Sequence, residues 1–144
     1  MDLDLSDDQQ LLKDQARKFL EDRCTSADVR RVFEGDQSYD ADLWQGLTEL
    51  GWLGTALPEQ YGGAGAGYIE LCVIAEELGR AIAPVPFSSS VYLAAEAILL
   101  AGSEQQKQDY LPKLAAGELI GTLALAEGPG TVDAASIQSH CDDG

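Results

Sequence analysis

Apolar residues recur at helical spacing through most of the first 117 residues, and the stripes that they form begin at residues that favour the N-terminus of a helix. Ser6 and Ser103 each stand three positions before a glutamine, which is the pattern of a capping box. Amphipathic helices bury their apolar faces only against one another. The sequence therefore predicts an all-α fold for residues 1–117, an antiparallel helical bundle whose further helices begin near Ser26, Asp40, Tyr68 and the serines at 88–90.

Two of these expected helices have distinctive sequences. The helix from residue 68 is expected to end at Gly79 and to carry Glu76 and Glu77 as surface acids, because neighbours on a helix point about 100° apart and form no carboxylate pair. The helix that follows the serines at 88–90 is apolar around most of its circumference. That pattern is typical of a central, buried helix.

Glycines and a proline punctuate an apolar background in residues 51–67. The apolar content indicates an ordered loop packed on the bundle, while the glycines permit positive φ and close backbone approach. We expect Trp52 and Tyr61 to brace this loop.

After Gly117 the pattern changes to short apolar runs that are typical of strands, at 119–125 and again at 134–140, and a turn signal closes the sequence. Two strands at the end of a helical domain form no stable sheet by themselves. We therefore expect a helical domain at residues 1–117 and the beginning of a β-domain at 118–144, so that the chain ends just inside that second domain.

The composition excludes several classes of function. Acidic residues outnumber basic ones by 25 to 9, and the net charge of -16 repels a phosphate backbone, which excludes nucleic acid as a partner. The N-terminus is acidic where a secretory signal needs basic residues, and no apolar run reaches the ~18 residues of a membrane span, which together predict a cytoplasmic protein. Cys24, Cys72 and Cys141 are scattered, so neither a disulfide framework nor a zinc site is expected.

Five short segments resemble the N-terminal part of the acyl-CoA dehydrogenase family, in the same order and at the same spacing. They are Leu50-Gly51-Trp52-Leu53-Gly54, Pro58-Glu59-Gln60-Tyr61-Gly62-Gly63, Glu76-Glu77-Leu78-Gly79, Ala101-Gly102-Ser103-Glu104-Gln105-Gln106-Lys107 and Tyr110-Leu111-Pro112-Lys113-Leu114-Ala115-Ala116-Gly117-Glu118. The resemblance that they mark extends over nearly the whole chain. No one of them is specific alone, but their shared order and spacing are.

The resemblance implies a helical N-terminal domain, a middle β-domain and a C-terminal helical bundle, with FAD held between the β-domain and the helices. It also implies α,β-dehydrogenation of an acyl-CoA thioester, in which a glutamate removes the α-proton and flavin accepts the β-hydrogen as hydride. In the family that glutamate lies in the C-terminal domain, so no catalytic residue is expected in this chain. The implied partners are the acyl-CoA substrate, an electron-transfer acceptor and further subunits of a homo- or hetero-oligomer.

The segment from Leu123 resembles the family's flavin-contacting motif, a Thr-Glu-Pro triplet followed by Gly-Ser-Asp. Here the triplet reads Ala126-Glu127-Gly128, so the threonine hydroxyl and the stiffening proline are both replaced. The residues expected to contact the cofactor are Leu123, Leu125, Ala126, Gly130 and Thr131. Read from spacing alone, the same segment is a plain strand followed by a turn, whose freed backbone N–H groups can meet an anion or a ring carbonyl.

The resemblance also implies that the helix near Ser90 forms one wall of the acyl pocket. The residues expected to contact substrate are Ser90, Leu93 and Ala94, together with Thr131. The alternative for Leu93 and Ala94 is a purely structural place in the core.

Two other functions remain open from the sequence. An acyl-CoA oxidase or a related flavin monooxygenase shares the domain plan of the family. A non-catalytic partner subunit or scaffold is the alternative of another class, because the altered Ala126-Glu127-Gly128 triplet weakens the cofactor contact.

Overall fold

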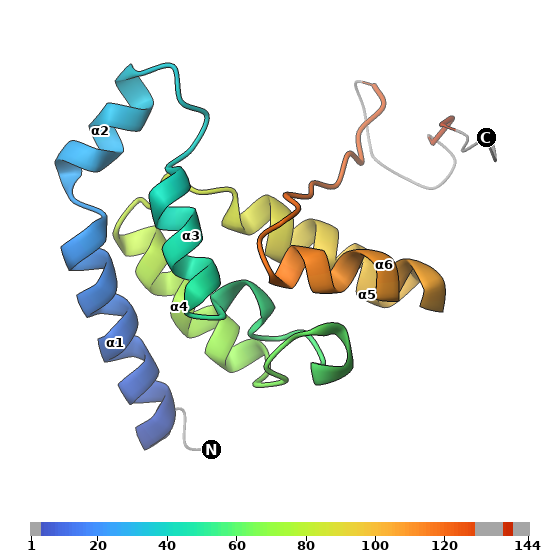
Figure 1. Ribbon diagram of the computed structural model, residues 1–144, viewed down its shortest axis with the longest axis horizontal. Coiled ribbons are helices and arrows are strands. Elements are labelled where there is room, and N and C mark those ends of the chain that lie inside the picture. The colour runs from blue at the N-terminus through green and yellow to red at the C-terminus, as the bar shows by residue number, and fades with distance from the viewer. Residues whose placement is uncertain (1–3, 129–136, 140–144) are drawn as a thin grey trace.

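The computed structural model describes residues 4–128 and 137–139. They form a bundle of short helices, in which α1 packs along α4, α6 packs on α5, and α3 leads into the loop that covers one end of the bundle (Figure 1). The α-helices are α1 (Asp7–Arg23), α2 (Ser26–Glu34), α3 (Ala41–Glu49), α4 (Tyr68–Arg80), α5 (Glu96–Ala101) and α6 (Glu104–Ala115). Shorter helical segments are η1 (Trp52–Gly54), η2 (Glu59–Tyr61) and the π-helical η3 (Ser88–Ala95), which runs directly into α5.

Local sequence signals set where these helices begin. Ser6 accepts the N–H of Gln9 at 3.2 Å while its own N–H donates to the Gln9 side chain at 3.0 Å, and Ser103 and Gln106 repeat the arrangement. Asp40 accepts the Leu43 N–H at 2.9 Å. Each contact satisfies a backbone donor that the first turn leaves unpaired. The predicted all-α fold and its helix starts are therefore confirmed for the N-terminal part of the chain. The predicted antiparallel arrangement is wrong for α1 and α4, which run parallel, since Gln9 and Arg17 meet Glu70 and Glu77 in the same order. The two helices are not consecutive, so no short loop forces them to be antiparallel.

The main core lies where α1, α3, η1 and α4 meet. Leu20, Leu47, Leu53 and Ile74, one from each of these elements, are almost completely buried there. A smaller cluster packs under α6 around Leu111. The two clusters explain why the helices depend on one another, since none has enough apolar surface to be stable alone.

The loop at 51–67 is ordered and packed on the bundle, as predicted. Trp52 meets Phe19 of α1 edge to face, with ring centroids 5.4 Å apart. Tyr61 is buried, and its hydroxyl donates to both carboxylate oxygens of Glu104 at 2.9 and 3.1 Å. The two aromatic residues thus tie the loop to α1 and to α6.

α4 does not end at Gly79, as the sequence predicts, but continues to Arg80. The helix closes in a Schellman motif, in which the N–H of Ala83 donates to Leu78 at 3.0 Å and that of Ile82 to Gly79 at 3.1 Å. Ile82 holds φ at +52°, a left-handed conformation that a β-branched residue rarely adopts, and 65% of its surface is exposed. Gly79 sits inside the helix, and the left-handed residue that closes it, Ile82, stands three positions later.

Glu77 is fully buried, which corrects the prediction that both neighbouring acids lie on the surface. Its carboxylate receives Arg17 at 2.7 and 3.1 Å and Arg80 at 2.7 Å. Glu76 is exposed and pairs with Lys13 at 2.9 Å. A third polar contact, from the Gln9 amide to Glu70 at 2.8 Å, joins the same two helices, α1 and α4.

The helix after residue 87 differs from its prediction in two ways. No serine caps it: η3 begins without a side-chain cap, and the Ser90 hydroxyl is used elsewhere. Nor is α5 buried, since none of its residues is buried and Leu100 is 78% exposed. α6 packs on one side of α5 while Leu100 and Ala101 stay exposed, so an apolar circumference here does not mean a central position.

Beyond α6, residues 118–128 form no helix and no strand with any described residue. The run at 119–125 has no neighbouring described segment to pair with, which a ladder requires. Of the second predicted strand, only residues 137–139 are described, and they form no strand either. The turn at 142–144 and Cys141 lie outside the described residues. Among the helices that the structure describes, none has both the length and the apolarity to span a bilayer.

Candidate functional site

The residues predicted to contact substrate and cofactor lie in two places. Ser90, Leu93 and Ala94 are on η3, and Leu123, Leu125 and Ala126 are on the extended tail that follows α6. Gly130 and Thr131 lie outside the described residues. The two groups approach each other where the tail crosses η3.

Gly121 is the point at which the tail touches η3. Its N–H donates to the Ser90 hydroxyl at 3.3 Å, and Ser90 is only 1% exposed. A Cβ placed on Gly121 would stand 2.4 Å from the Cβ of Ala94, so only glycine permits this approach. Ser90 and Ala94 are therefore beneath the tail, while Leu93 is exposed on another side of the helix.

The start of the tail is fixed at Gly117. This residue holds φ at +67°, its carbonyl accepts the indole N–H of Trp44 at 3.4 Å, and a Cβ here would stand 2.4 Å from the Thr48 hydroxyl. The N–H of Leu119 donates to the carbonyl of Lys113 at 3.2 Å. Residues 117–121 are thus held against α3, α6 and η3.

From residue 122 the tail leaves the bundle (Figure 1). No hydrogen bond joins the backbone amides of residues 122–126 to any other described residue, and Leu123 and Leu125 are 41% and 51% exposed. Accessible amides flanked by exposed apolar side chains fit the edge of a planar, partly polar ring such as a flavin. Ala126 has no hydroxyl to add, so the segment fits FAD through its backbone and its leucines only.

Glu127 marks the far end of this segment. Its carboxylate accepts the N–H groups of Gln138 and Ser139, the latter at 3.1 and 3.2 Å. Hydrogen bonding from Ser139, together with the backbone N–H of Gln138, holds the pKa of Glu127 below its ordinary value. Sequence reasoning assigned Glu127 no role of its own, because the partners that it holds are more than ten residues away.

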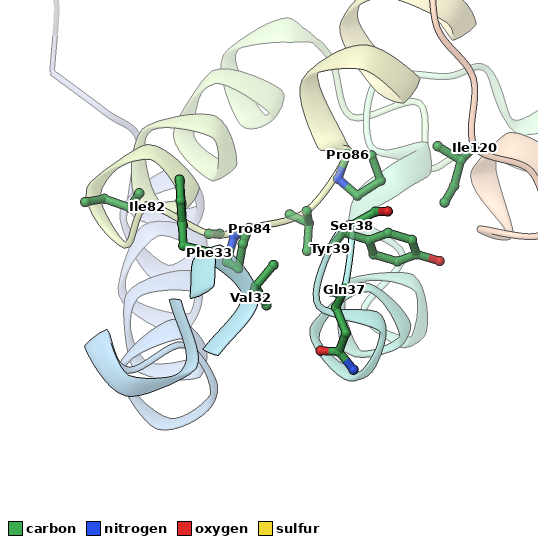
Figure 2. Close-up of a pocket in the computed structure, with 11 residues that line it drawn as sticks. Val32, Phe33, Gln37, Ser38, Tyr39, Ile82, Pro84, Pro86 and Ile120 are labelled. Carbon is green, nitrogen blue, oxygen red and sulfur yellow. The ribbon is translucent and has the colours of Figure 1, made fainter. Parts of the chain in front are cut away.

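A cavity of about 610 Å³ opens beside the start of the tail (Figure 2). Figure 2 shows Phe33 and Ile82 on one side of it and Tyr39 and Ile120 on the other, with Pro84 and Pro86 along the chain between them. Its lining is predominantly apolar and includes none of the predicted site residues. Ile120 connects this cavity to the tail, since it lines the cavity and directly precedes Gly121.

The chain matches the family model described as the N-terminal domain of acyl-CoA dehydrogenase over residues 6–118. It is 36% identical over 140 residues to a mitochondrial isovaleryl-CoA dehydrogenase of Pongo abelii, covering 93% of this chain and 32% of that protein. The fold is similar to one in the ChsE4-ChsE5 complex from Mycobacterium tuberculosis, with a TM-score of 0.82, 32% identity and coverage of 91% of this chain and 36% of that one. It is also similar to a glutaryl-CoA dehydrogenase of Mycobacterium smegmatis in complex with FADH2, with a TM-score of 0.71, 30% identity and coverage of 81% and 30%.

The matched regions run through the helical bundle and continue into the tail, and the chain spans about a third of the length of the curated relatives that it matches. The family match includes the capping boxes at Ser6 and Ser103, the loop at 51–67 and the helix that carries Glu77. The chain therefore belongs to the acyl-CoA dehydrogenase family, of which it carries the N-terminal domain.

Proposed function

We propose that this chain is the N-terminal helical part of an FAD-dependent acyl-CoA dehydrogenase, and that it contributes one wall of the acyl pocket and one edge of the flavin site. The observation that carries the proposal is the tail at 122–126, which leaves a family-specific helical bundle with accessible amides and exposed leucines. The related glutaryl-CoA dehydrogenase in complex with FADH2 supports the choice of cofactor.

In this proposal the chain binds and orients but does not remove a proton. Bound FAD would supply the oxidation by accepting hydride from the acyl chain. The backbone amides of Leu125 and Ala126 would donate to one edge of the flavin, and Leu123 would exclude water from it. Gly130 and Thr131 would follow in the same site, and Leu93 would line the acyl pocket. The base is assigned to no residue of this chain.

The same proposal covers partners and location. The relatives that act on acyl-CoA thioesters support an acyl-CoA substrate, and the two-component complex among the similar structures supports a homo- or hetero-oligomer. An electron-transfer acceptor and a cytoplasmic location complete it. An oxidase or flavin monooxygenase would use the same bundle in the same way.

A second candidate function is a partner subunit that has lost flavin. The observation that favours it is Ala126, which offers a methyl group where the family motif has a hydroxyl. A flavin-free subunit would keep the bundle and lose the ring contact.

The test is the affinity of the complete enzyme for FAD, measured by fluorescence titration of the apoprotein. Because a net hydrogen bond contributes about 0.5–1.5 kcal/mol, Ala126→Thr should tighten binding by about 2- to 13-fold. Leu123→Asp should weaken it, since a charge would face the ring. Ala124→Thr adds the same hydroxyl two residues away and should leave the affinity unchanged. No FAD binding by the wild type would favour the partner subunit.

A further inference from the structure

The described tail has a single side-chain attachment to η3, at Gly121. The Ser90 hydroxyl that receives its N–H is a buried polar group on an otherwise apolar helix face, next to Val91, Ala94 and Ala95. Buried hydroxyls are normally paired, and serine in a helix commonly bonds to a preceding backbone carbonyl. Here the serine instead accepts a hydrogen bond from a segment 31 residues away.

Gly121 also packs too closely against η3 to accept a side chain. The backbone of Gly121 lies so close to η3 that an added Cβ would meet Ala94 at 2.4 Å and Leu114 at 3.4 Å. Adding a side chain at Gly121, or a larger side chain at Ala94, would lift the tail away from Ser90. The hydrogen bond and the close packing therefore hold the same residue of the tail in two independent ways.

We propose that Ser90, Ala94 and Gly121 form a positioning junction, which sets where the segment 122–126 is presented to the flavin. The inference rests on the proposed function and reassigns Ser90 and Ala94 from the acyl pocket to this junction. Because even a fully extended chain rises only about 3.3 Å per residue, Leu123–Ala126 lie within about 7–17 Å of Gly121. Since no hydrogen bond from their backbone amides to a described residue holds them in between, a shift at the junction passes directly to them.

The experiment compares four variants of the complete enzyme with the wild type. Ser90→Ala removes the acceptor, and Gly121→Ala creates the clash with Ala94. Adding Ala94→Gly to Gly121→Ala moves the methyl group from η3 to the tail. This removes the clash and should restore the close contact between the two segments. Ser89→Ala is the matched control, because that neighbouring hydroxyl donates to the Pro86 carbonyl at 3.1 Å. The readouts are FAD affinity, the visible circular dichroism of the bound flavin, acyl-CoA affinity and the thermal midpoint.

We expect Ser90→Ala to weaken FAD binding by about 2- to 13-fold, the range of one net hydrogen bond, and to change the flavin dichroism. Gly121→Ala should do so more strongly, and the double variant should return both readouts toward wild type, while Ser89→Ala matches wild type. The junction is refuted if the variants lower only the thermal midpoint, or if Ser90→Ala changes acyl-CoA affinity alone, as a pocket residue would. A wild type that binds no FAD would instead overturn the proposed function, and the junction's role with it.

Discussion

The buried Glu77 carboxylate should make the stability of this domain depend on pH in a way that one variant can isolate. Glu77 has no exposed surface and receives Arg17 and Arg80 at 2.7 Å each. Hydrogen bonding from Arg17 is the largest cause that lowers the pKa of Glu77 from 4.5 to about 2, against the opposing effect of burial, and Arg80 adds to it. The charged form is therefore the one that the fold stabilises.

The sign and size of the effect follow from this shift. An unfolded chain takes up the proton as pH falls through 4.5, whereas the folded one resists until about pH 2. The stabilisation is thus complete above pH 4.5 and is lost between 4.5 and 2. A fall from 4.5 to about 2 corresponds to about 3 kcal/mol. Because both guanidinium groups are partly open to water, which weakens their interaction with Glu77, we expect about 2 kcal/mol of this stabilisation.

The assay is urea unfolding, followed by circular dichroism from pH 7 down to pH 3, for wild type, Glu77→Gln and Glu76→Gln. At pH 7 Glu77→Gln should unfold with about 2 kcal/mol less free energy, and the deficit should shrink as the pH falls below 4.5. Glu76→Gln removes the exposed neighbour of the same helix and should cost less than about 0.5 kcal/mol at every pH. A Glu77→Gln deficit that stays constant with pH, or one that Glu76→Gln equals, would refute the reasoning.

Three further outcomes are expected. Ile82→Gly should be more stable than Ile82→Ala by about 0.5–1 kcal/mol in thermal or urea unfolding. Both variants lose the isoleucine side chain beyond Cβ, but only glycine relieves the left-handed φ. The reverse order would show that the residue is unstrained. Gly117→Ala should lose about 2–4 kcal/mol through strain and contact with Thr48, and Thr48→Ala should recover part of the loss in the same unfolding assay. The 144-residue chain alone should purify without visible flavin absorbance and without acyl-CoA dehydrogenase activity; a stoichiometric yellow protein would contradict this.

Signals that act over a few residues allowed the helices to be predicted. The capping boxes at Ser6 and Ser103 pair groups three positions apart, so the sequence contains both partners. The prediction of where α4 ends failed because it relied on the same kind of local signal. Glycine is the usual left-handed residue, and nothing local shows that Ile82 would take that conformation instead.

Contacts between distant segments could not be predicted in the same way. The burial of Glu77 depends on Arg17, 60 residues earlier, and the use of Ser90 depends on Gly121. For Gly121 a signal existed: a glycine inside an apolar strand-like run often marks a close backbone approach. It shows that something comes near, but not which helix.

The polar contacts between α1 and α4 also determine how far one helix can slide along the other. Gln9, Lys13 and Arg17 stand four residues apart, hence on one face, and each meets a carboxylate of the parallel α4. Apolar side chains tolerate an axial slip of one turn, about 5.4 Å, because one aliphatic group can take the place of another. The same slip would separate the three pairs and take Arg17 away from the buried Glu77, which would keep Arg80 of its own helix. These ionic and amide contacts therefore fix the axial alignment of α1 and α4, which the apolar contacts between the two helices do not fix by themselves.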